Sequence, residues 1–95
     1  MPSLDVAHVR EQGQNMLLFP LDSSFGHKSM ADQQRTLSTL TRRANAAGLA
    51  GTAVAFWQSG GRTHFMGPRQ WRAFLECLSM WQVQANVNRT ISWTD

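Results

Sequence analysis

The stretch TAVAFWQSGGRTHFMGPRQWRAFL, from Thr52 to Leu75, contains the signals for a strand, a tight turn, a second strand and the start of a helix. Residues 53–57 are apolar and are followed by turn-forming residues, which is typical of a β-strand. Gly60 and Gly61 can both adopt the positive φ angles of a two-residue hairpin turn, because neither has a Cβ atom. A four-residue loop would keep the same register. The predicted pairs are Ser59 with Arg62, Gln58 with Thr63, Trp57 with His64, Phe56 with Phe65, and Ala55 with Met66.

Side chains alternate along paired strands, so the hairpin residues divide between two faces of the sheet. Val54, Phe56 and Phe65 share one face. Trp57 and His64 share the other, directly opposite each other, and we expect the imidazole to stack on the indole. If helices cover the first face, this pair lies on the open face. It is then either an ordinary packing contact between strands or an aromatic platform for a base, a peptide side chain or a second subunit.

The chain after the hairpin predicts a helix that begins at Pro68, since proline suits the first helical position, where its missing N–H is not needed. Apolar residues between 71 and 78 follow at spacings of 3, 1 and 3, which is one helical stripe. Arg69, Arg72 and Glu76 share the polar side of this helix. Arg72 and Glu76 are four residues apart and can form an ion pair.

The region 81–88 (WQVQANVN) is open to two interpretations. It alternates apolar and polar residues like a strand, yet no glycine or proline separates it from the preceding helix. We expect the helix to continue to about Asn86, with a short strand at 90–93. The alternative is a helix that ends near Met80 and is followed by an extended tail.

Residues 6–21 predict a first hairpin around Gly13. Its register stays open, because a loop of two or three residues would place the side chains on different faces. Pro20 cannot donate a ladder hydrogen bond, so its strand either ends there or runs along an edge of the sheet. Ser29 is suited to begin a helix, with Asp32 as its capping partner, and Gly48 is suited to end it in a Schellman motif. The expected buried stripe of that helix consists of Met30, Leu37, Leu40, Ala44 and Ala47.

These elements predict an α+β fold for residues 1–95 as a single domain. The expected order is ββαββα with an optional last strand. We expect a two-layer sandwich, in which a mainly antiparallel sheet carries both helices on one face.

The composition excludes several classes of protein. A hydrophobic fraction of 42% and a charged fraction of 16% are typical of a globular rather than a disordered chain. No apolar run approaches the roughly 20 residues that cross a bilayer, so a membrane partner is not expected. The first residues contain no apolar core of the kind found in signal peptides. One cysteine, Cys77, excludes an internal disulfide. We therefore expect a cytoplasmic protein.

Positive charge is concentrated in the middle of the chain. No Asp or Glu occurs between Asp32 and Glu76, whereas six arginines do. The planar guanidinium suits phosphate and carboxylate groups. These arginines are either a basic surface for nucleic acid or scattered solvated charges. They are Arg35, Arg42, Arg43, Arg62, Arg69 and Arg72.

Motifs of known catalytic and metal sites are missing from the sequence: there is no P-loop, dinucleotide fingerprint, HExxH, CxxC or G-x-S-x-G. The ligand count disfavours zinc, because His8, His27 and His64 lie far apart in the chain. We therefore predict no catalytic residue, metal or cofactor. Residues 22–28 (DSSFGHK) contain groups capable of acid–base chemistry, but such polar loops are common.

Three functional hypotheses follow. The first is a non-catalytic interaction module, expected to be a homodimer, that binds a partner protein through an exposed sheet face or edge. Trp71 and Trp81 fit the buried helical stripe, which leaves Trp57 and Trp93 as partly exposed interface residues. The second is a nucleic-acid-binding protein that places the arginines on phosphates. The third is a small enzyme with a histidine acid or base. The predicted binding residues are Trp57, His64, Arg62, Arg69, Arg72 and Arg42.

Overall fold

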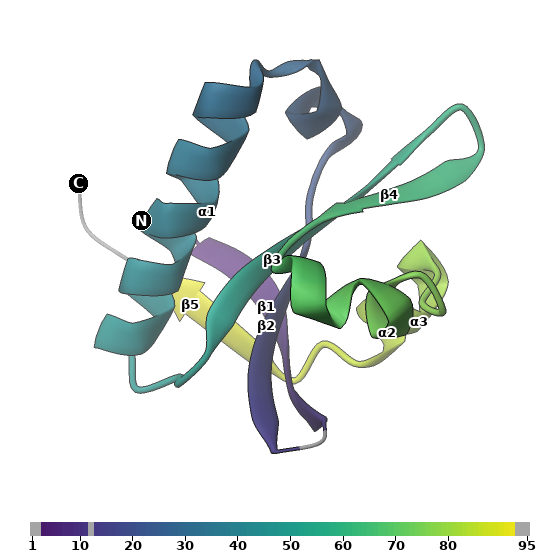
Figure 1. Ribbon diagram of the computed structural model, residues 1–95. Coiled ribbons are helices and arrows are strands. Elements are labelled where there is room, and N and C mark those ends of the chain that lie inside the picture. The colour runs from purple at the N-terminus through teal and green to yellow at the C-terminus, as the bar shows by residue number, and fades with distance from the viewer. Residues whose placement is uncertain (1–2, 12, 93–95) are drawn as a thin grey trace.

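The computed structural model describes residues 3–11 and 13–92, and its ribbon is shown in Figure 1. The described strands form one sheet in the order β4-β3-β2-β1-β5. Helical segments connect β2 to β3 and β4 to β5, and short turns make the other connections. The elements in chain order are β1 (Ser3–Glu11), β2 (Gln14–Pro20), the 3₁₀ helix η1 (Ser23–His27), α1 (Met30–Ala46), β3 (Thr52–Ser59), β4 (Arg62–Met66), the 3₁₀ helix η2 (Arg69–Trp71), α2 (Arg72–Leu75), α3 (Met80–Ala85) and β5 (Arg89–Ser92).

The chain is α+β as predicted, but the sheet is mixed rather than mainly antiparallel. β2 and β3 are parallel neighbours at the centre of the sheet. Parallel neighbours need a long crossover connection, and the 17 residues of α1 provide it between the end of β2 and the start of β3. The other neighbouring pairs are antiparallel. The predicted order ββαββα with a final strand is recovered in outline.

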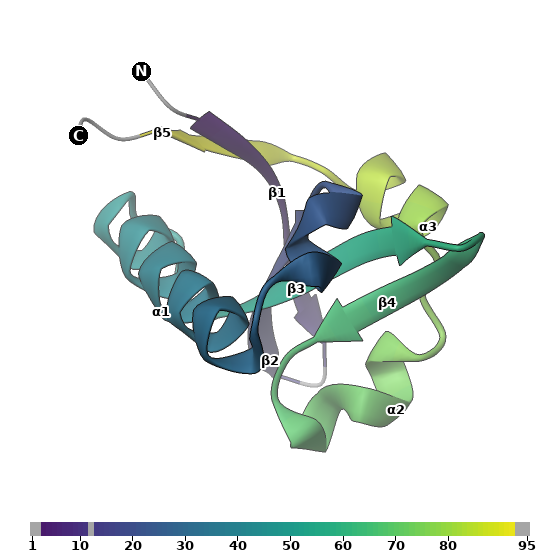
Figure 2. The same ribbon diagram turned by 90° about the horizontal axis from the view of Figure 1, so that it is seen from above.

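Helices lie on both faces of the sheet, so the prediction that both helices pack on one face is wrong. Figure 2 shows α1 on one side of the strands and α2 with α3 on the other. Leu40 of α1 belongs to a core cluster with Leu17 of β2. Leu75 of α2 and Val83 of α3 belong to another with Val54 of β3. The physical reason is that the central strands are apolar on both sides and therefore need cover on both faces.

Both hairpins form where the sequence predicts them. β3 and β4 have the predicted pairing from Ser59 with Arg62 to Ala55 with Met66. Gly60 and Gly61 have φ angles of 60° and 77°, as the tight turn requires. In the first hairpin, β1 ends at residue 11 and β2 begins at residue 14, so the shorter of the two possible loops is present. Pro20 ends β2 at the centre of the sheet and does not lie on an edge.

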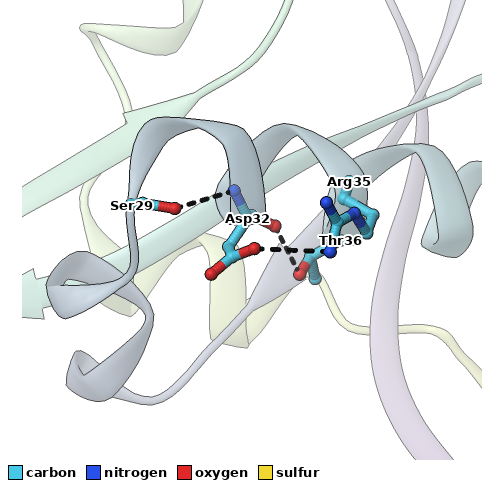
Figure 3. Close-up of polar contacts among 4 residues, drawn as sticks. All are labelled: Ser29, Asp32, Arg35 and Thr36. Atoms are coloured by element: carbon cyan, nitrogen blue, oxygen red, sulfur yellow. Dashed lines mark hydrogen bonds and ion pairs between the residues drawn. The ribbon is translucent and has the colours of Figure 1, made fainter.

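Ser29 caps the N-terminus of α1 as predicted, whereas the carboxylate of Asp32 faces Arg35 and does not complete the expected capping box (Figure 3). Ser29 is the N-cap, and its Oγ accepts a hydrogen bond from the backbone N–H of Asp32 at 3.2 Å. The Asp32 carboxylate lies 3.5 Å from Arg35. The hydroxyl of Thr36 donates to the carbonyl of Asp32 at 2.9 Å. These contacts fix where the helix begins after η1.

The C-terminus of α1 has the predicted Schellman geometry, with Gly48 at φ 90° and the N–H of Leu49 donating to the carbonyl of Ala44 at 2.9 Å. The ends of the predicted stripe are wrong, however. Met30 is 61% exposed and Ala47 is exposed.

In the first turns of α1, Gln33 rather than Met30 is buried. The reason is that this part of the helix meets η1, where the Gln33 amide donates to the carbonyl of Phe25 at 3.0 Å.

The predicted continuous helix from residue 68 to residue 86 is wrong, and so is its alternative with an extended tail after Met80. The segment divides into η2, α2 and α3. Ser79 begins α3 with a capping box, in which its Oγ accepts from the N–H of Gln82 at 3.3 Å and its own N–H donates to Oε1 of Gln82 at 2.8 Å. The break turns Trp81 outward, so this predicted core residue is 75% exposed.

The predicted last strand is present as β5, although its residue 93 lies outside the described residues. No helix in the described part of the chain is long and apolar enough to span a membrane.

Candidate functional site at the β4 edge

β4 is an edge strand, and two of its residues direct their backbone groups away from the sheet. The carbonyl of Phe56 in β3 accepts a hydrogen bond from the N–H of Leu21, just past the end of β2, at 2.7 Å, so even-numbered residues of β3 face β2. Odd-numbered residues of β3 therefore bond to β4, including Trp57. In an antiparallel pair hydrogen-bonded and non-bonded positions alternate. The register then leaves the N–H and C=O groups of Thr63 and Phe65 on the outer side of β4.

The start of β3 and the loop before it, beyond the end of β4, are covered by side chains of α1. The Thr41 hydroxyl accepts from the N–H of Ala53 at 2.9 Å. The amide of Asn45 donates to the carbonyls of Leu49 at 2.8 Å and Gly51 at 3.3 Å. Such cover prevents unwanted pairing at a sheet edge. No comparable hydrogen bond from the described residues reaches the outer backbone of β4.

A groove of about 430 Å³ runs along the outer edge of β4, which is called the rim below. Residues 63–68 form one wall, and Arg69, Arg72 and Glu76 line the rest. The chain enters η2 through Gly67, which passes so close to Val54 that a Cβ atom there would lie 2.9 Å from Cγ2 of the valine. This close approach lets the segment after β4 bend back beside the strand.

The charged side chains of the groove are not all neutralised within the protein. Nε of Arg72 lies 2.7 Å from Oε1 of Glu76, which is the predicted ion pair. Arg69 is exposed and has no ion pair among the described residues. With two arginines and one glutamate in its lining, the groove carries a net positive charge. Arg62, at the start of β4, is exposed but does not line the groove.

The Trp57–His64 pair stacks as predicted, with ring centroids 5.7 Å apart and an interplanar angle of 16°. It is not an open platform, because Trp57 is only 9% exposed. Phe25 of η1 lies against the indole at a centroid distance of 5.0 Å. Gly26 of η1 also packs against the indole, because a Cβ atom added to this glycine would lie 2.5 Å from Nε1 of Trp57. The expected open face is thus covered by η1, and only His64 is exposed.

The six arginines of the middle of the chain do not form one group. Arg62 belongs to the edge strand β4, and Arg69 and Arg72 belong to η2 and α2 on one face of the sheet. The other three belong to α1, on the opposite face of the sheet (Figure 2). Of these, Arg35 pairs with Asp32 and Arg42 is exposed. The structure brings His64 together with Arg69 and Arg72 in one groove, and it does not bring Arg42 there.

The three histidines have different surroundings, and two of them lie outside the groove. Nε2 of His8 lies 3.0 Å from the carbonyl of Ala50, a contact that ties β1 to the loop before β3. His27 ends η1 and is exposed. The described residues contain no group of three or more His, Cys, Asp or Glu side chains that could hold a metal ion.

The backbone of Thr63 and Phe65 was not among the predicted binding residues. The two-residue turn at Gly60 and Gly61 fixes which amides of the second strand point outward, so the hairpin itself contained this signal. The strand order, which makes β4 an edge, was the missing information.

No protein-family model, curated protein or solved structure matches this chain.

Proposed function

We propose that this chain is a non-catalytic interaction module that binds an extended segment of a partner protein as an added strand along β4. The observation that carries this proposal is the pair of outward backbone positions, Thr63 and Phe65, beside an open groove. Edge strands bind peptides by main-chain hydrogen bonds, and side-chain pockets at alternate positions supply specificity. Of the two surfaces expected from the sequence, the edge is favoured over the face, because helices cover both faces.

The main chain alone gives only weak binding. Thr63 and Phe65 together offer two N–H and two C=O groups, and each net hydrogen bond contributes about 0.5–1.5 kcal/mol. The sum is roughly 2–6 kcal/mol, which corresponds to a Kd of about 1 mM near its middle. Side chains in the groove must therefore add affinity and select the partner.

A peptide-display selection on the folded chain tests this function. Random peptides of about nine residues are long enough to cover the five residues of β4. The selected peptide is then synthesised with one backbone N-methyl group at each position in turn. Strand addition predicts that binding is lost at every second position, where the peptide N–H faces β4, and is retained between them. The proposal is contradicted if every N-methylated peptide still binds, or if binding is lost at every third or fourth position as in a helix. It is also contradicted if the selection yields no binding peptide.

Two further measurements separate this function from the alternatives. The homodimer stays a prediction, and a sedimentation mass equal to one chain at high micromolar concentration would remove it. Binding to a random oligonucleotide that collapses between low and moderate salt would favour the nucleic-acid hypothesis. In that case Arg42→Ala on α1 should weaken binding as much as Arg62→Ala beside the groove.

A further inference from the structure

The charge of the groove indicates what kind of segment it accepts. Arg69 and Arg72 line it against a single carboxylate, Glu76. The Arg72–Glu76 pair is exposed, with 72% and 53% of the two side chains accessible, and exposed pairs of this kind contribute little to stability. An incoming carboxylate can therefore share Arg72 with Glu76, and at Arg69 it meets no ion-paired acid from the described residues.

The packing of η2 and α2 determines which side of an added strand meets these arginines. Trp71 and Leu75 pack in the same core cluster as Val54 and Phe56, with Phe65 against its border. Both arginines thus come from the segment on the Phe65 side of the sheet. Side chains of an added strand alternate between the two faces, so every second one points to this side.

The intervening side chains of an added strand fall on the other face of β4. There they meet His64, whose imidazole is exposed, and Met66, which is partly buried. These neighbours suit an aromatic or aliphatic side chain, because cross-strand aromatic and apolar pairs stabilise a sheet. The side chains of an added strand therefore meet arginines on one face and His64 with Met66 on the other, so acidic and apolar residues are favoured at alternate positions.

We propose that the occupant of the β4 groove is an extended segment of a partner protein with acidic side chains at alternate positions and apolar side chains between them. This inference rests on the proposed strand addition. Guanidinium groups bind carboxylates through strong, charge-assisted hydrogen bonds. A second copy of this chain fits less well, because its β4 rim would bring arginines against arginines. A nucleic acid lacks the alternating N–H and C=O groups that Thr63 and Phe65 would pair with.

The peptides selected on the folded chain test this composition directly. The proposal expects enrichment of Asp or Glu with a period of two. A selected peptide and its copy with glutamine in place of each acid should then differ about ten-fold in Kd, and the difference should shrink as salt is raised.

Arg69→Gln should weaken the acidic peptide about three-fold and leave the glutamine copy unchanged. Arg42→Gln removes the same charge from the opposite face of the sheet and is the matched control, with no expected effect on either peptide. Both side chains are exposed, so neither substitution is expected to unfold the protein.

The outcomes separate this inference from the function it rests on. Selected peptides that are neutral or basic, yet lose binding with a two-residue period on N-methylation, overturn the acidic partner and keep strand addition. Acidic peptides that tolerate N-methylation everywhere overturn both. Acidic peptides that respond equally to Arg42→Gln and Arg69→Gln overturn the placement of their carboxylates in the groove. Selected peptides that are rich in Asp or Glu but do not have them at every second position overturn the assignment of the carboxylates to the Phe65 side of the sheet.

Discussion

Replacing Trp57 by alanine measures whether this residue is a core side chain or part of an open surface. In the structure it is 9% exposed, packs on Phe25 and stacks with His64. Truncation of a buried tryptophan to alanine costs about 3–5 kcal/mol. A folded chain of 95 residues typically has a total free energy of unfolding of roughly 5–14 kcal/mol. Trp57→Ala should therefore remove a large part of the stability.

His64→Ala is the matched control. The imidazole stacks on the same indole but is exposed, so its loss should cost about 0.5–1 kcal/mol. The assay is urea unfolding followed by far-UV circular dichroism, with the slope m compared between variants. With m of about 1.5 kcal/mol/M, the tryptophan variant should lower the midpoint by roughly 2–3 M and the histidine variant by less than about 0.7 M.

If Trp57→Ala is too unstable to purify, Trp57→Phe retains much of the apolar volume and should cost about 1–2 kcal/mol. A loss below about 1 kcal/mol for Trp57→Ala, equal to that of His64→Ala, would refute the reasoning. The indole would then be a surface group, and the Trp57–His64 face would be open.

Three further substitutions test the supports of the edge by thermal or urea unfolding. Gly67→Ala should destabilise by about 1–3 kcal/mol, because its Cβ would lie 2.9 Å from Val54; a neutral effect would contradict the close approach. Thr63→Val should cost about 1 kcal/mol, since it removes the hydroxyl that accepts from the N–H of Met80 at 3.1 Å, and Thr63→Ser should restore most of it. Trp81→Ser should change stability by less than about 0.5 kcal/mol, because Trp81 is 75% exposed; a loss of several kcal/mol would show that it is buried.

Local signals predicted the hairpins and the first helix. Gly60 and Gly61 determine a tight turn, and strand alternation then fixes every pair between β3 and β4. Ser29 and Gly48 cap the two ends of α1, where short-range hydrogen bonds pair backbone groups that the helix itself leaves unpaired. Such features depend on residues a few positions apart, so the sequence contains them in full.

The segment after Pro68 shows where a local pattern is insufficient. Its apolar spacing continues through the break, so a single helix satisfies the periodicity equally well. The serine and glutamine at positions 79 and 82 were the available signal for a new helix start. Packing decides the outcome, because the break allows Leu75 and Val83 to enter the same core, both with no exposed surface.

The placement of the helices and the identity of the edge depend on contacts between distant segments. Residues 16–19 are all buried, and such an uninterrupted apolar run indicates a strand covered on both faces. It does not indicate which helix covers which face. The groove beside β4 likewise needs the strand order, because the same hairpin at the centre of the sheet would have no free rim. Six arginines are evident in the sequence, but only the fold separates Arg69 from Arg42.

Residue-resolved amide hydrogen exchange of β4, measured by NMR with and without a selected acidic peptide, tests strand addition most directly. In the free protein the N–H groups of Thr63 and Phe65 should exchange faster than those of His64 and Met66, which bond to β3. With the peptide bound, Thr63 and Phe65 should become protected while the other two change little. Saturating peptide that leaves Thr63 and Phe65 in fast exchange would contradict the assignment of β4 as the binding edge.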